Sequence, residues 1–175
     1  MSGDLRFFVE KVLSGNIFPS ERFVSDHNSL LLITRLLREA GKTIVMTTGA
    51  FDVFHAGHAV YLQKAKEAGG QNSILVVGVD SDRWIREKKH RDPIRSLEDR
   101  VLTVAHLRSV DIVTEKYFED ITQFVRPHIS VRSESSLKMS QERLTEMRKY
   151  CDRIIFFPPQ SDTHSGDLIR KMSEG

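Results

Sequence analysis

The chain has 175 residues, 39% of them hydrophobic, and a formal net charge of only +2, with 26 Lys and Arg against 24 Asp and Glu. This length suits one domain with its own core, and the near-balanced charge gives no reason to expect a nucleic-acid partner. We expect a cytoplasmic protein without a membrane partner, because no apolar run could span a bilayer, the first residues do not resemble a signal peptide, and the lone Cys151 cannot form an intramolecular disulfide.

The first forty residues carry no recognisable chemistry. Apolar spacing predicts helices over residues 5–13 and 29–40, and the second has one face able to cover a sheet or a partner. Several phenylalanines in this stretch favour packing against the core, with a homodimer contact as the alternative. We expect residues 1–40 to form a helical extension packed on the core, and residues 41–175 to form the main domain.

A strand, a glycine turn and a helix follow. Residues 43–48 are a short β-branched and apolar run, which predicts a buried strand closed by Gly49. From His58 the larger or apolar side chains recur at helical spacing until Gly69 and Gly70, a typical stop signal. The turn therefore leads directly into the start of a helix.

This helix start favours an anion. Its first N–H groups are unpaired and the helix dipole adds partial positive charge, so phosphate binds well there. His55 and His58 share one helix face, and Gly57 leaves room for a phosphate or base between them. Surface histidines and half of a metal site are the alternatives, but zinc sites usually recruit three or four ligands and no such cluster is evident. The segment predicts a nucleotide triphosphate site, in which Asp52 orders the turn.

Strands and helices alternate in the rest of the chain. We predict strands over residues 73–79, 110–113, 129–131 and 154–157, and helices over residues 97–107, 118–124, 136–150 and 163–172. Strands separated by helices imply a parallel sheet covered on both faces. The fold class is thus α/β, with a Rossmann-like, doubly wound, five-stranded parallel sheet. Ligands of such sheets lie at the carboxyl ends of the strands, where the histidine turn lies.

Two further segments are rich in charged or polar side chains. Residues 86–93 are mostly basic and predict a solvated loop after the second strand. Near the C-terminus, Thr163, His164 and Ser165 would place donors and backbone N–H groups at a second helix start, and Arg170 could add a charge-assisted contact. A plain N-capped terminal helix is the alternative there.

The run G-A-F-D-V-F-H-A-G-H, residues 49–58, resembles the signature of the cytidylyltransferase-like nucleotidyltransferases. The resemblance extends from about residue 29 to the C-terminus. Residues 36–111 look most like the adenylyltransferase domain of the bifunctional heptose kinase/adenylyltransferase, with glycerol-3-phosphate cytidylyltransferase as the next neighbour.

The resemblance implies transfer of a nucleoside monophosphate from ATP or CTP to a phosphorylated small acceptor, with a sugar 1-phosphate such as heptose 1-phosphate favoured. Pyrophosphate is released, Mg²⁺ accompanies the triphosphate, and no protein metal site is expected. His55 and His58 would be catalytic. The residues expected to bind the nucleotide are Thr47, Thr48, Gly49, Ala50, Phe51, Gly57, Lys88, Lys89, Arg100, Arg132, Thr163, His164, Ser165 and Arg170.

Three positions depart from the family pattern, and the second and third of them motivate another hypothesis. Asp92 precedes Pro93 where the family often has Arg, and Gly166 stands where a second hydroxyl is common. Residues 132–136 read Arg-Ser-Glu-Ser-Ser, where members usually have Lys-Gly-x-Asp. The alternatives are a catalytically weak nucleotide-binding or regulatory module on the same fold, and a CTP-dependent alcohol-phosphate cytidylyltransferase.

Overall fold

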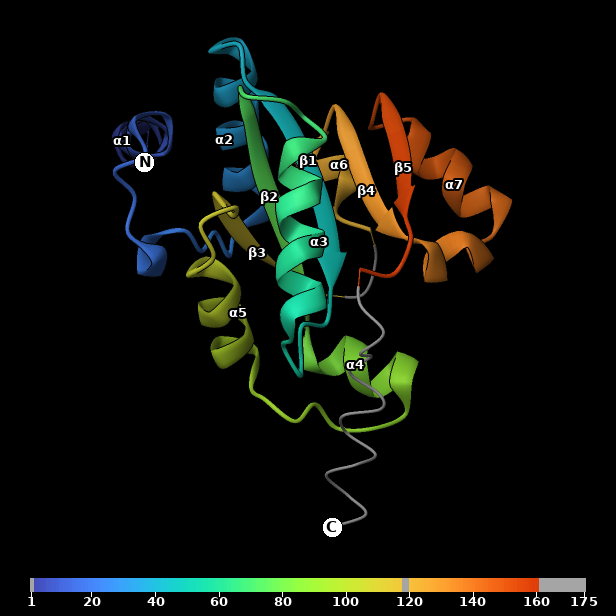
Figure 1. Ribbon diagram of the computed structural model, residues 1–175. Coiled ribbons are helices and arrows are strands. Elements are labelled where there is room, and N and C mark those ends of the chain that lie inside the picture. Colours follow the sequence, from blue (N-terminus) through green and yellow to red (C-terminus); the bar gives the residue numbers. More distant parts are fainter. Residues whose placement is uncertain (1, 118–119, 161–175) are drawn as a thin grey trace.

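The computed structural model describes residues 2–117 and 120–160, and its centre is a five-stranded, all-parallel sheet (Figure 1). The strand order is β3-β2-β1-β4-β5. The strands are β1 Thr43–Gly49, β2 Ser73–Asp80, β3 Ile112–Lys116, β4 Ile129–Ser133 and β5 Arg153–Phe157. The predicted α/β class and parallel sheet are confirmed. The order reverses between β1 and β4, which is where ligands of such sheets bind.

Helices cover both faces of this sheet. The α-helices are α1 Ser2–Ser14, α2 His27–Glu39, α3 Ala56–Glu67, α4 Asp82–Lys89, α5 Leu97–Ala105, α6 Thr122–Val125 and α7 Gln141–Arg148, and two 3-10 turns are η1 Pro19–Glu21 and η2 Glu134–Lys138. Apolar residues of α1, α2 and α6 pack on one face, and those of α3 and α5 pack on the other. Along β1 the side chains alternate accordingly, with Ile44 and Met46 in the first cluster and Val45 in the second.

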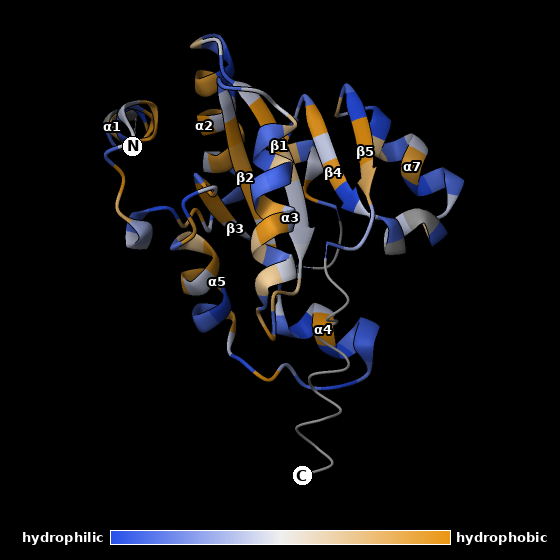
Figure 2. Ribbon diagram, in the orientation of Figure 1, coloured by the Kyte–Doolittle hydropathy of each residue, from blue (hydrophilic) through white to orange (hydrophobic). Residues whose placement is uncertain are grey.

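Burial of the central strands follows from their sequence. Every residue of β2 is buried, as expected for a strand covered on both faces, and Figure 2 shows its hydrophobic colouring along most of its length. Gly69 follows α3 and lies tightly against β1, since a Cβ there would lie 2.5 Å from the Val45 side chain. A side chain at Gly69 would push the helix end off the sheet.

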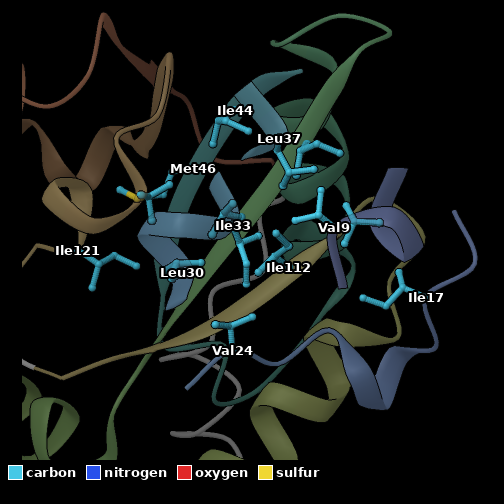
Figure 3. Close-up of a cluster of buried hydrophobic side chains, with 14 residues drawn as sticks. Val9, Ile17, Val24, Leu30, Ile33, Leu37, Ile44, Met46, Ile112 and Ile121 are labelled. Atoms are coloured by element: carbon cyan, nitrogen blue, oxygen red, sulfur yellow. The ribbon is translucent and has the colours of Figure 1, made fainter. Parts of the chain in front are cut away.

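The N-terminal segment is part of the same core. Val9 and Ile17 contact the cluster that includes Leu30, Ile33 and Leu37 of α2 (Figure 3). The chain before α2 also runs beside β3, where the Val24 N–H donates to the Val113 carbonyl at 2.8 Å. Arg22 Nη1 donates to three carbonyls of the α5–β3 connection, at Ala105, Leu107 and Val110. The domain boundary at residue 40 stays a prediction.

Several element boundaries differ from the sequence prediction. The basic segment expected as a loop begins as α4, which the Ser81 hydroxyl caps by accepting from the Trp84 N–H. This helix has a single buried side chain, Ile85, so its apolar periodicity is too weak to detect. The helix predicted over residues 136–150 is divided into η2 and α7. The terminal helix predicted over residues 163–172 lies outside the described residues.

Candidate active site

The turn between β1 and α3 lies at the carboxyl end of the central strand. Phe51 adopts a left-handed backbone, with φ of 50°, and its side chain is only 4% exposed. Its ring packs on Gly49, where a Cβ would come within 3.0 Å of the ring. A left-handed phenylalanine is rare, and packing holds it in place here. Gly49 is therefore required by the close approach of Phe51.

The two histidines form a cap at the start of α3. His55 is the N-cap residue, and its Nδ1 accepts from the Gly57 N–H at 3.2 Å. His58 Nδ1 accepts in return from the His55 N–H at 3.3 Å, and the ring centroids are 4.0 Å apart. Because both Nδ1 atoms accept, each neutral ring carries its proton on Nε2. The structure thus brings together two imidazoles with the same tautomer at a helix N-terminus.

His58 is enclosed by aromatic rings. The centroids of Phe51 and Phe54 lie 5.5 and 5.4 Å from its ring. Burial, with smaller contributions from the charges of His55 and Lys89, lowers the pKa of His58 to about 4. The ring is therefore a neutral hydrogen-bond donor at pH 7.

This pKa predicts an acid-sensitive stability. The lowered pKa means that the unfolded chain binds the His58 proton more readily between about pH 6.5 and 4, so the free energy of unfolding falls as the pH drops through this window. Substitution of His58 with glutamine should remove this component. Thermal unfolding of both proteins between pH 7 and 4.5 measures it, and equal pH slopes would contradict a buried neutral His58.

Asp52 ties the turn to the segment before α5. Its buried carboxylate accepts from the Ile94 and Arg95 N–H groups at 2.8 and 3.0 Å, and it pairs with Arg91 at 2.7 Å. Burial alone would raise the pKa of Asp52, but the hydrogen bonds from Arg95 and Arg91 hold it below its usual value. The carboxylate therefore orders the turn, as the sequence suggested.

Arg100 supports the turn from inside the protein. Its side chain is fully buried, and Nη1 donates to the carbonyls of Ala50 and Asp80, both at 2.7 Å. Nε donates to the Arg95 carbonyl at 3.1 Å, and Nη2 pairs with Asp82 at 2.5 Å. The sequence placed this guanidinium against the triphosphate. In the structure its donors are occupied by the protein, so the correction is that Arg100 positions the backbone of the turn.

The threonines at the end of β1 face opposite sides of the sheet. Thr47 is fully buried and its hydroxyl lies 2.8 Å from the Tyr61 hydroxyl of α3, so it joins strand to helix instead of pointing to a phosphate. The Thr48 hydroxyl accepts from Arg132 Nη1 at 2.7 Å. Arg132, at the end of β4, is buried and pairs with Asp120 at 2.8 Å. The structure thus joins two predicted site residues, Thr48 and Arg132, at the switch in strand order.

The two candidate lysines lie in the last turn of α4. Lys88 Nζ is 5.1 Å from the centroid of the Trp84 ring. The charge of Lys89 instead contributes to the lowered pKa of His58, and desolvation together with nearby Arg91 lowers the pKa of Lys89 itself. Of the two lysines, Lys89 is therefore the one whose charge acts on the histidine turn.

The sequence prediction missed a buried ion pair at the same edge. Lys116, the last residue of β3, pairs with Asp80, the last residue of β2, at 2.6 Å, and both side chains are buried. Lys116 Nζ also lies 4.2 Å from the Trp84 ring centroid. The sequence signal that could have revealed this pair is a charged residue at the end of a predicted buried strand. Lys116 and Arg132 are thus two buried cations along the carboxyl edge of the sheet.

Some predictions concern parts that the structure leaves out. Thr163, His164, Ser165 and Arg170 lie outside the described residues. Within residues 2–117 and 120–160, no group of three His, Cys, Asp or Glu side chains could hold a metal ion. In the same part of the chain, no helix is long and apolar enough to cross a membrane.

Comparison with known proteins identifies the family of this chain. Residues 46–172 match the Cytidylyltransferase-like family, a range that contains the histidine turn. The bifunctional protein HldE of Nitratiruptor sp. is 42% identical over 120 residues, which are 65% of this chain and 25% of that protein. HldE of Coxiella burnetii is 33% identical over 162 residues, 89% of this chain and 33% of the relative. The chain thus spans about a quarter to a third of these relatives.

A solved structure shares the fold. The lipopolysaccharide core biosynthesis protein from Thermoplasma volcanium superposes with a TM-score of 0.58 at 27% sequence identity. The match covers 67% of this chain and 97% of that protein.

Proposed function

The chain belongs to the cytidylyltransferase-like family of nucleotidyltransferases, and we propose that it transfers a nucleoside monophosphate from a nucleoside triphosphate to a phosphorylated small acceptor, releasing pyrophosphate. The observation that carries this proposal is the adjacent pair of imidazole rings, His55 and His58, at the start of α3. Two imidazoles with Nε2 protons beside a helix N-terminus form a donor cluster suited to a triphosphate.

The proposed reaction needs no protein nucleophile. An oxygen of the acceptor phosphate attacks the α-phosphorus, the bond to the β-phosphate oxygen breaks, and pyrophosphate leaves with the electron pair. Catalysis then depends on alignment and on stabilising charge at the α-phosphate and the leaving oxygen. His55 and His58 donate there, the amides of residues 49–51 hold the phosphates, and Lys89 adds a positive charge.

The carboxylates around the turn already have partners. Asp52 binds two N–H groups and Arg91, Asp80 pairs with Lys116, and Asp82 pairs with Arg100. They therefore do not form a magnesium cage, and Mg²⁺, which favours phosphate oxygens, would be held mainly by the triphosphate and neutralise it.

For the substrates, ATP with a sugar 1-phosphate ranks first and CTP with an alcohol phosphate second. The likeness to the heptose adenylyltransferase domain supports the first pair, as does the solved neighbour named for lipopolysaccharide core biosynthesis. The acceptor phosphate would lie near Arg132 and Lys116, the two buried cations at the strand ends. A nucleotide-binding module without turnover is the second candidate, because residues 132–136 lack the usual Gly and Asp.

A pyrophosphate-release assay tests the proposal. Each of ATP, CTP, GTP and UTP is combined with heptose 1-phosphate, another sugar 1-phosphate and glycerol 3-phosphate in the presence of Mg²⁺. We expect release with ATP and a sugar 1-phosphate, and none without an acceptor. Nucleotide binding measured by calorimetry, together with no release from any pair, would support the module without turnover.

A further inference from the structure

A basic cavity lies at the edge of the sheet opposite to the histidine turn. Its volume is about 270 Å³, and its basic and acidic lining residues are Arg38, Arg126, His128, Arg148, Lys149 and Asp152. They come from the C-terminal ends of α2, α6 and α7 and from the segments that enter β4 and β5. Figure 1 shows these ends at the top of the sheet, whereas the strands point toward the turn at the bottom.

Three of the cations lack an anionic partner in the part of the chain that the structure describes. Lys149 pairs with Glu146, but no carboxylate there pairs with Arg38, Arg126 or Arg148. The Nε of Arg38 is buried and has no hydrogen-bond partner among those residues. The protein therefore does not fully satisfy the Arg38 guanidinium, and the charge of this group at the cavity wall would stabilise an anion there.

Helix dipoles account for part of this cluster, because Arg38 and Arg148 lie in the last turns of α2 and α7 and Arg126 directly follows α6. Attraction to the dipole is electrostatic, and it leaves the donors of a guanidinium free unless the group also bonds the last carbonyls of the helix. Within residues 2–117 and 120–160, none of the three guanidinium groups donates to a carbonyl, and Arg126 instead lies 5.8 Å from the Tyr150 ring centroid. Their hydrogen-bonding capacity is therefore still available to a ligand.

His128 adds a donor of defined tautomer. Its Nδ1 accepts from the Ile44 N–H at 2.9 Å, at the start of β1. The neutral ring therefore carries its proton on Nε2. This bond also fixes the imidazole at the wall of the cavity, so its orientation is set before any ligand arrives.

We propose that this cavity binds the phosphate group of a small phosphorylated metabolite. Guanidinium groups match phosphate oxygens in geometry and charge. The volume is below the roughly 300–1,000 Å³ typical of sites for drug-sized ligands, which favours a phosphate group over a whole nucleotide. Nucleic acid is disfavoured, because it needs an extended basic surface and the whole chain carries a net charge of only +2.

Amide chemical shifts during a phosphate titration test this proposal. The probe is inorganic phosphate added to the full chain, at constant ionic strength, with sugar 1-phosphate in a second arm. We expect saturable shifts at Arg126, at His128 and at residues 148–152, distinct from any shifts at residues 49–58. Tighter binding of the sugar phosphate would identify a metabolite as the ligand, and equal affinity would identify free phosphate.

Charge-neutral variants give the control. The double variant R38Q/R148Q should weaken phosphate binding in the cavity about tenfold or more, since each arginine contributes a charged hydrogen bond. R35Q/R108Q removes two exposed arginines elsewhere and should leave the affinity within about twofold. The single variant R148Q, at an exposed position, should weaken binding even if the double variant unfolds. Unsaturable shifts, or equal affinities in all variants, would overturn the proposal and leave the histidine site unaffected.

Discussion

Replacing His58 with glutamine is expected to lower kcat by about 10²- to 10³-fold, the usual cost of removing one donor to a developing negative charge. The imidazole accepts from His55 N–H on Nδ1 and donates from Nε2 across the ring. Glutamine at the third position of a helix can keep the cap acceptor, but its side chain has one more rotatable bond than histidine and does not hold the N–H donor in the direction set by the ring. Steady-state pyrophosphate release measures the loss.

Two further measurements separate chemistry from folding in this experiment. Thermal unfolding at pH 7 should change little in H58Q, because the glutamine keeps the reciprocal cap. H55N provides the matched case, since asparagine is a good N-cap and would preserve the acceptor for the Gly57 N–H while it removes the other imidazole. Full activity in H55N and H58Q would show that the reacting phosphate binds elsewhere.

Replacing Arg100 with leucine is expected to lower the free energy of unfolding by about 3–5 kcal/mol, the cost of leaving partners of a buried charge uncompensated. The leucine would fill part of the volume but leave the carbonyls of Ala50, Asp80 and Arg95 without their donor. For a chain of this size, the melting temperature should fall by at least about 6 °C.

The control for Arg100 is an exposed arginine that forms an ion pair on the surface of a helix. Arg35 is 72% exposed and pairs with Glu39 one helical turn away, so R35Q should change the stability by less than about 0.5 kcal/mol. Chemical denaturation of both variants gives the comparison. If R100L were as stable as R35Q, the donors of Arg100 would not hold the turn, and the direct phosphate contact expected from the sequence would regain support.

Most strands and helices could be predicted from the sequence because the core elements have clear apolar patterns. The run in β1 and the uninterrupted burial of β2 follow from their apolar residues, and the alternation with helices requires a parallel sheet. Weak apolar periodicity explains where the predicted helices differ from the structure. Helix α4 buries only Ile85, and the segment after β4 divides into η2 and α7, with Ser140 as the cap of the second helix.

At the site, the sequence alone determined the arrangement of residues that are neighbours in the chain, between the end of β1 and the start of α3. A glycine turn, two histidines three residues apart and the start of a helix are neighbours in the chain, so their proximity requires no knowledge of the fold. The capping of α3 by His55 and His58 is a local geometry of this kind.

Only the tertiary structure decided the role of residues that are distant in sequence. Arg100 and Thr47 looked like phosphate ligands, but the fold buries both and gives their polar groups to the Ala50 carbonyl and the Tyr61 hydroxyl. Conversely, the pairing of Lys116 with Asp80 arises because β3 lies beside β2 and the two strands end together. The physical reason is that burial and a partner determine whether a charged or hydroxyl group can reach a ligand, and both depend on which strands and helices become neighbours.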